Sequence, residues 1–266
     1  MKKSIETARQ DPVPVRRCSK SPVNRSLERG VDILRAFRPG SDLLGNGELA
    51  ERTGLARATV SRLTQTLVGT GFLQYDTAQR GYRLGAPVLS LAHAMHAASP
   101  VLQVAAPWMR AVAMDLRINV SLAVPDRDEM VYLESVRYNR KATLRSVVTG
   151  QRVPIELTSL GHAWLAVAPA DQRCALLAAF AERRGAQWPA LRGQIDQAID
   201  SVHSQGWCAA SWQPEVVALA APLVCAQHPV HVLNMSVSSP ASVDAVVRQL
   251  REPLRALAAR IVDALQ

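Results

Sequence analysis

The chain has 266 residues and a mass of 28.9 kDa, which is long enough for two domains that each bury a core. With 48% hydrophobic and 20% charged residues, its composition excludes a chain that is disordered throughout. Residues 1–98 carry 15 Lys and Arg against 8 Asp and Glu, net +7, whereas residues 99–266 carry 16 against 14, net +2. This uneven charge favours a nucleic-acid partner for the first part, because bound phosphates are neutralised by cationic side chains.

The cysteines form no CxxC pair and have no scaffold spacing, which is typical of a reduced compartment. The first residues include two lysines but not the apolar segment of a secretory signal. The apolar run 216–237 is interrupted by Pro222 and Pro229, which suits adjacent buried strands and not a membrane span. The sequence therefore predicts a cytoplasmic protein without a membrane partner.

The N-terminal segment, residues 1–24, combines prolines and basic residues without apolar periodicity, which predicts a disordered basic tail. Apolar residues at helical spacing then predict an amphipathic helix that Pro39-Gly40 closes. Its apolar positions are Leu27, Val31, Leu34 and Phe37.

Residues 49–67 have the pattern of two helices that cross at a sharp turn. Ala50 permits a close crossing, and Gly54 can take the left-handed conformation that the turn requires. The apolar positions that pack both helices onto the preceding one are Leu49, Leu55, Val60, Leu63 and Leu67. This is the pattern of a helix-turn-helix, whose second helix enters the DNA major groove. By itself it also fits an ordinary helical hairpin with a solvated outer face.

The second of these helices, residues 58–67, has a polar and positive face opposite its apolar face. Arg can bond a guanine edge, Gln an adenine edge, and Ser or Thr a base or a phosphate. We expect DNA contacts from Arg57, Ala58, Thr59, Ser61, Arg62, Gln65 and Thr66.

A β-hairpin is expected next, with strands near 72–75 and 81–85 around the polar loop 76–80. A hairpin in this position is a wing, and it distinguishes a winged helix-turn-helix from a helical hairpin. Arg80 and Arg83 are placed to reach phosphates or the minor groove. The sequence therefore predicts a winged helix-turn-helix DNA-binding domain over residues 25–85.

The rest of the chain predicts an α+β domain with an antiparallel sheet over residues 101–266. An apolar helix in the linker 86–100 is expected to join the domains and help to pair DNA-binding heads. Further helices are expected near 101–116, 160–167, 171–183, 191–204 and 241–265. Strands are expected near 118–124, 130–137, 143–148, 216–223 and 231–237.

Several segments in combination resemble the IclR-type bacterial transcriptional regulators. They are residues 26–34, 81–85, 150–154, 158–166, 220–223 and 236–240, and the resemblance covers about 26–266. It implies a GAF-like effector-binding domain, and homodimers that often pair into homotetramers on double-stranded operator DNA. It also implies a small organic or aromatic acid as effector, control of a catabolic operon, and no cofactor.

The resemblance further implies a ligand pocket between the sheet and a loop-helix element. Its ligand-binding positions would be Ser159, Leu160, Gly161, Ser236 and Ser238. A helix that begins near Ser159 suits an anion on physical grounds as well, because its first N–H groups and its dipole point outward. Two departures from the family are Pro222, where some members have a cysteine, and the segment 206–218, which keeps Glu215 as its acidic residue.

The sequence leaves three alternatives open. Ser159 near a helix start and six histidines could suggest a hydrolase, but the sequence has no Gly-x-Ser-x-Gly, His-Glu-x-x-His or phosphate-binding glycine loop. Cys225, His228 and His231 are spaced three apart and could bind a metal, although a histidine in a hairpin turn is more often simply exposed. A DNA-architectural protein without a ligand would not need residues 101–266.

Overall fold

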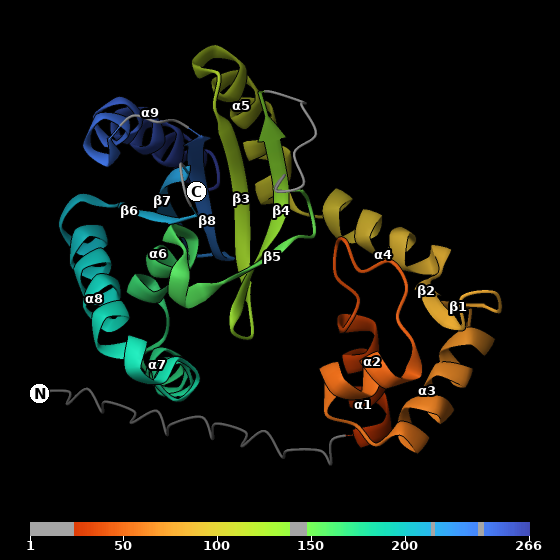
Figure 1. The fold of residues 1–266 in the computed structure, drawn as a ribbon. Helices are drawn as coiled ribbons and strands as arrows, with labels where there is room; N and C mark the ends of the chain where they lie inside the picture. Colours follow the sequence, from red (N-terminus) through yellow and green to blue (C-terminus); the bar gives the residue numbers. More distant parts are fainter. Residues whose placement is uncertain (1–23, 139–147, 214–215, 239–241) are drawn as a thin grey trace, which may run out of the picture. The chain divides into compact units, whose positions relative to one another are not determined.

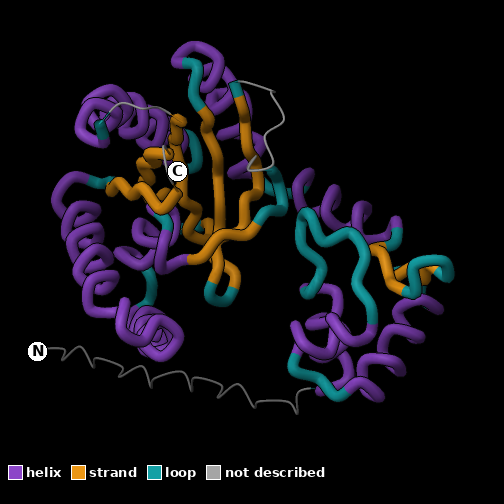
Figure 2. Tube along the Cα trace, in the orientation of Figure 1, coloured by secondary structure: helices purple, strands orange, loops and turns teal. Residues whose placement is uncertain are grey.

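The computed structural model describes residues 24–138, 148–213, 216–238 and 242–266, and it confirms an α+β fold with an antiparallel sheet. The described residues belong to two compact units (Figures 1 and 2). The first includes the described part of Met1–Phe37 together with Leu43–Leu84, and the second includes Arg38–Asp42 and Gly85–Gln266. The predicted basic tail, apart from Asn24, lies outside the described residues.

The first unit is a winged helix-turn-helix, as the sequence predicts. Its elements are α1 (Arg25–Arg35), α2 (Asn46–Thr53), α3 (Arg57–Gly69), β1 (Leu73–Asp76) and β2 (Gly81–Leu84). The side chain of Asn24 caps α1, because its Oδ1 accepts from the amides of Ser26 and Leu27 at 3.1 Å each. Gly54 ends α2 in the left-handed conformation, at φ 68°, which lets the chain turn into α3.

The apolar stripe predicted for α1 is partly wrong. Leu27 and Val31 are 67% and 41% exposed, whereas Ile33 is fully buried. Residues 24–28 are all exposed, so the first turn of α1 extends beyond the core. The helix instead buries the side that carries Ile33 and Phe37, which pack in a core with Leu49, Val60 and Leu73.

A six-stranded antiparallel sheet forms the centre of the second unit. In spatial order its strands are β5 (Arg152–Pro154), β4 (Glu129–Arg137), β3 (Asn119–Asp126), β8 (His228–Ser238), β7 (Val216–Cys225) and β6 (Cys208–Gln213). The sequence predicts the four inner strands and misses both edge strands, because β5 is short and β6 is rich in small residues. Residues 143–147 of the strand expected near 143–148 lie outside the described residues.

Helices cover both faces of this sheet (Figure 1). The helices of the unit are α4 (Ala86–Ala97), α5 (Pro100–Leu116), α6 (Ser159–Val167), α7 (Ala170–Arg184), α8 (Trp188–Gln205) and α9 (Val243–Asp263), with short 3-10 turns η1 (Ile155–Leu157) and η2 (Gly185–Gln187). On the face covered by α5 and α9, Leu219 packs with Leu254. On the face covered by α6, α7 and α8, Val232 belongs to the same core as Phe180 and Ile195. Because successive strand residues point to opposite faces, every second residue of a strand belongs to the α6 face, except where a β-bulge shifts the register.

Helix α4 differs from the others because it buries none of its residues. Leu89, Leu91 and Met95 are 75%, 60% and 51% exposed. In the described part of the chain no single helix is long and apolar enough to span a membrane. Helices α4 and α5 meet that length and composition as a pair, with an 83° bend between them.

Candidate DNA-binding surface and ligand site

Helix α3 buries one side and presents the predicted DNA-binding residues on the other. Val60 and Thr64 are fully buried, and the Thr64 hydroxyl donates to the Val60 carbonyl at 2.9 Å. The exposed or partly exposed residues are Arg57, Ala58, Thr59, Ser61, Arg62, Gln65 and Thr66. The helix contains no acidic residue, so this side is positive and suits a phosphate backbone.

The two wing arginines have different surroundings. Arg80 lies exposed in the turn between β1 and β2, with a positive φ of 51°. Arg83 donates to Asp76 Oδ2 at 3.4 Å and to Gln79 Oε1 at 3.2 Å, so part of its charge is balanced within the wing. Arg80 is therefore the wing cation with the more open guanidinium.

On the α6 face of the sheet, the strand register aligns small and polar residues in two rows that run across the strands. The inner row is Cys208, Ala220, Asn234, Ser121 and Ser135, and the outer row is Ala210, Ala218, Ser236, Asn119 and Arg137. The hydroxyls of Ser121 and Ser135 are 3.1 Å apart, which shows that paired residues of β3 and β4 share this face. Apart from Arg137 at one end of the outer row, both rows are thus a floor of short side chains, unlike the leucine-rich opposite face.

The first residue of α6 sits on the inner row. Asn234 Nδ2 donates to Ser159 Oγ at 3.3 Å and to the Leu219 carbonyl at 3.1 Å. The Cys208 thiol donates to the Ser159 carbonyl at 3.5 Å. Thr158 caps the helix by accepting from the Gly161 amide at 3.2 Å. Among the described residues, no acceptor is assigned to the amides of Ser159 and Leu160.

Helix α6 runs away from the outer row. Its start contacts Asn234, whereas Trp164, five residues later, lines a cavity together with Val230. The helix therefore follows β8 backward, and its N-terminus faces the end of β8 where Ser236 and Ser238 lie. Ser236 is partly buried and Ser238 is exposed. Amide donors and the positive end of a helix dipole thus lie at the end of α6 that is nearer to the outer row, an arrangement that suits an anion.

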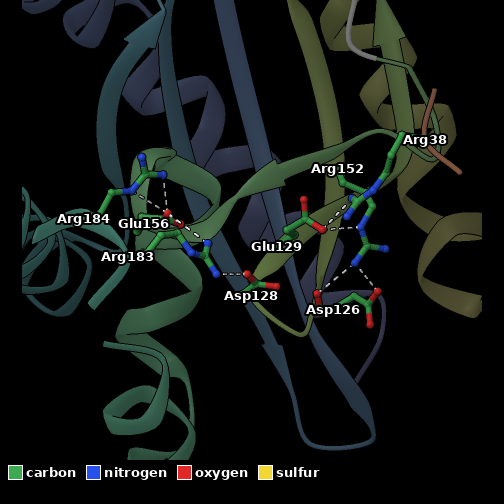
Figure 3. Close-up of polar contacts among 8 residues, drawn as sticks. All are labelled: Arg38, Asp126, Asp128, Glu129, Arg152, Glu156, Arg183 and Arg184. Carbon is green, nitrogen blue, oxygen red and sulfur yellow. Dashed lines mark hydrogen bonds and ion pairs between the residues drawn. The ribbon is translucent and has the colours of Figure 1, made fainter. Parts of the chain in front are cut away.

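Ion pairs hold the segment that leads into α6 (Figure 3). On β5, Arg152 donates to Glu129 Oε2 at 2.7 Å and to Asp126 Oδ2 at 2.5 Å. These contacts tie β5 to the turn between β3 and β4, beyond the short pairing of β5 with β4.

Glu156, in η1, is fully buried and accepts from Arg184 Nη2 at 2.6 Å. Its other oxygen, Oε2, has no partner among the described residues. Arg183, beside Arg184, pairs with Asp128 (Figure 3). Burial opposes ionisation of Asp128, but the hydrogen bonds to its carboxylate and the positive charges of Arg183 and Arg152 together outweigh burial and lower the pKa of that carboxyl. Together these pairs fix η1, and hence the start of α6, against the C-terminus of α7.

A cavity of the second unit lies beside the predicted ligand positions. It has a volume of about 630 Å³ and is bordered by β6, α8 and the start of α9. Its lining includes Cys208 and Ala210, which belong to the two rows, and His162 of α6. Its lining does not include Ser159, Leu160, Gly161, Ser236 or Ser238. The cavity therefore meets the candidate site along β6, and its volume is typical of small-molecule pockets.

Sequence reasoning missed Asn234, Asn119 and Arg137 as members of this site. Asn234 shares the alternation of Ser236 and Ser238 along β8, so that signal was present. The positions of Asn119 and Arg137 depend on pairing across three strands, which the sequence alone does not specify.

The site contains no arrangement typical of nucleophilic catalysis. The Ser159 hydroxyl contacts Asn234, and burial raises the pKa of the Cys208 thiol to about 12, which disfavours a thiolate. In the described part of the chain, no group of three His, Cys, Asp or Glu side chains is placed to hold a metal ion. His231 Nδ1 instead lies 2.7 Å from the Pro229 carbonyl.

Comparison with known families gives two adjacent matches. The model of the IclR helix-turn-helix domain matches residues 26–77, and that of the C-terminal domain of the bacterial transcriptional regulator IclR matches residues 93–263. The chain is also 37% identical over 183 residues to the HTH-type transcriptional regulator TsaQ1/TsaQ2 of Comamonas testosteroni. That alignment covers 68% of this chain and 66% of the relative, so just under two thirds of the relative's length is matched.

Solved structures agree with these matches. An IclR family transcriptional regulator from Brucella abortus is 33% identical and superposes with a TM-score of 0.82, covering 94% of this chain and 97% of that one. An IclR homolog from Microbacterium hydrocarbonoxydans, solved in complex with 4-hydroxybenzoate, has a TM-score of 0.68 and covers 90% of this chain and 98% of that one. At 24% identity this second likeness concerns the fold.

Proposed function

Because this chain belongs to the IclR family of bacterial transcriptional regulators, we propose that a small organic acid controls its DNA binding from a site at the start of α6. In this proposal residues 25–85 bind the operator through α3 and the wing. Residues 86–100 link them to residues 101–266, which bind the effector. The regulated genes are proposed to form a catabolic operon for the same class of acid.

The observation that supports this site most directly is the hydrogen bond from Asn234 to Ser159, at 3.3 Å. It holds the N-terminus of α6 over the sheet face that carries Ser236. In this proposal the amides of Ser159 and Leu160 and the hydroxyls of Ser236 and Ser238 bind one ligand. Each hydrogen bond to a charged acceptor contributes roughly 1.5–3 kcal/mol, so a few of them can offset the free-energy cost of removing water from a carboxylate.

An aromatic or other apolar body on the acid is supported by the short side chains of the two rows and by the adjacent cavity. The structural relative bound to 4-hydroxybenzoate supports the same class of ligand. Serines at the ligand positions suit neutral hydrogen bonding to the carboxylate, whereas acidic residues there would repel it.

Calorimetry on the full chain tests the site. Acetate, succinate, benzoate and 4-hydroxybenzoate are compared first for the rise in melting temperature that they produce, because a ligand of the folded state stabilises it. The Ser236→Ala/Ser238→Ala variant should bind the best of them at least about tenfold more weakly. Ser204→Ala, on the exposed side of α8, is the matched control and should bind as wild type does. Equal affinity in the double variant would place the ligand elsewhere, and no binding of any acid would contradict control by an organic acid.

A homodimer, or a pair of dimers, is proposed as the working form. The exposed apolar residues of α4, among them Leu89, Leu91 and Met95, support this, because such a surface is costly in water. Two copies would also match the symmetry of a palindromic operator. Leu89→Glu/Leu91→Glu should shift the mass measured by light scattering toward the monomer; an unchanged mass would contradict the role of α4.

A further inference from the structure

Arg137 brings a positive charge to the sheet face that the proposed ligand would occupy. It pairs with Asn119 on β3, and Asn119 pairs with Ser236 on β8. Val136 and Val120, the preceding pair, belong to the opposite core, so Arg137 and Asn119 are on the α6 face. Two strand spacings separate the backbones of Arg137 and Ser236, about 10 Å, and an arginine side chain can cover most of that distance.

The other strand arginine cannot fill this role. On the described strands of the sheet the arginines are Arg137 and Arg152, and Arg152 is bound by Asp126 and Glu129. Arg137 is partly buried and already interacts with other groups of the chain, which restrains its guanidinium. Five N–H donors leave an arginine able to bind a carboxylate in addition to such a contact.

We propose that Arg137 and Asn119 are ligand-binding residues and that the effector is a planar monocarboxylate. This inference rests on the proposed function and extends it. The carboxylate lies between the Arg137 guanidinium and the start of α6, where Asn119 and Ser236 also reach it. The planar apolar body lies over Ala218 and Ala210, whose side chains are single methyl groups.

The neighbouring cavity supports the orientation of the ligand. Ala210 belongs both to the outer row and to the lining of the 630 Å³ cavity. If Arg137 holds the carboxylate and the attached ring lies over Ala218, the ring therefore extends toward this cavity. Arginine holds a planar carboxylate through two parallel hydrogen bonds, which fixes the plane of the attached ring, and lysine does not.

The experiment measures affinities of the full chain for benzoate, 4-hydroxybenzoate and the neutral analogue benzamide. In Arg137→Gln the affinity for the better carboxylate should fall by about tenfold or more, because a charge-assisted bidentate contact is lost. Arg137→Lys keeps the charge without the bidentate geometry and should lie between Arg137→Gln and wild type. Benzamide should bind all three proteins equally and weakly. Arg110→Gln, on the exposed side of α5, is the matched control and should match wild type.

The outcomes separate this inference from the function on which it rests. A carboxylate that binds Arg137→Gln and wild type equally, or benzamide that binds wild type as tightly as benzoate, overturns the role of Arg137. If the serine double variant still loses affinity in that case, the proposed function stands. If acetate or succinate binds and the aromatic acids do not, the effector is not the planar acid proposed here, but the proposed control by an organic acid still stands. If no acid binds wild type, both fail. A near-wild-type melting temperature for Arg137→Lys shows that any loss is not a loss of fold.

Discussion

A β-carbon on Gly161 would lie 2.0 Å from the carbonyl oxygen of Ile155. No other residue therefore fits at 161 while η1 and α6 keep their positions. The same close approach brings Glu156 and Thr158 under the start of α6, where Thr158 caps it and Glu156 binds Arg184. The proposed ligand site thus depends on backbone packing within one short segment.

Gly161→Ala should lower the free energy of unfolding of the second unit by about 3 kcal/mol or more, at the upper end for overpacking, because backbone must move. All five tryptophans belong to residues 85–266, so tryptophan fluorescence in urea reports on this unit. Gly193→Ala, in α8, is the control: its β-carbon meets nothing within 4 Å, and the change should stabilise by about 0.5–1 kcal/mol. Equal effects at the two positions would show that the contact with Ile155 is not tight.

His162 should make the stability of the second unit dependent on pH. Burial lowers the pKa of His162 below its ordinary value of 6.5, and outweighs the Glu156 carbonyl and carboxylate, which favour the charged form. As the pH falls, His162 is therefore protonated in the unfolded chain before it is protonated in the folded chain. The free energy of unfolding is therefore highest above about pH 6.5. It decreases as the pH falls toward the lower pKa that His162 has in the folded state. His162→Gln keeps a donor for the Glu156 carbonyl and should flatten the decrease between pH 6.5 and 5.

In His162→Gln the stability should still decrease somewhat over this pH range, because burial also lowers the pKa of His231. His93→Gln, at an exposed position of α4, should keep the full wild-type slope. A slope in His162→Gln identical to that of wild type would show that His162 stays uncharged or is accommodated when charged.

Arg62→Ala should weaken operator binding by roughly 1–3 kcal/mol and relax sequence preference at one or two operator positions, as expected for a base-edge contact. An operator selected from random DNA by the wild-type protein serves as the target in fluorescence anisotropy. Arg110→Ala removes an exposed arginine from the second unit and should leave both affinity and preference unchanged. Unchanged binding and salt dependence in Arg62→Ala would mean that α3 does not read the groove.

Replacing both wing arginines, Arg80 and Arg83, with alanine should weaken specific and non-specific DNA binding together. The salt dependence of binding should flatten by up to about two phosphate contacts. Because Asp76 already balances Arg83, Arg80→Ala alone should account for most of the change. A loss confined to one DNA sequence, with the salt slope intact, would instead indicate base reading by the wing.

The parts of the molecule that sequence predicted well are those governed by local periodicity. The face of α3 follows from helical spacing, and the common face of Ser236 and Ser238 follows from strand alternation. The exposed Leu27 and Val31 were mispredicted because their burial depends on where α2 and α3 end against α1. The contact between Asn234 and Ser159 joins residues 75 apart, and the alignment of Arg137 with Ser236 requires the register of three strands, so neither is encoded in a local pattern.

An acid bound beside α6 is proposed to change the affinity of the protein for DNA. The most direct measurement is operator affinity of the full chain, by fluorescence anisotropy, with and without the acid that binds it best. We expect a change of about 5–150-fold in wild type, the usual range for coupled sites, and little change in Ser236→Ala/Ser238→Ala at the same acid concentration. An acid that saturates the wild-type protein and leaves its operator affinity unchanged would contradict the account.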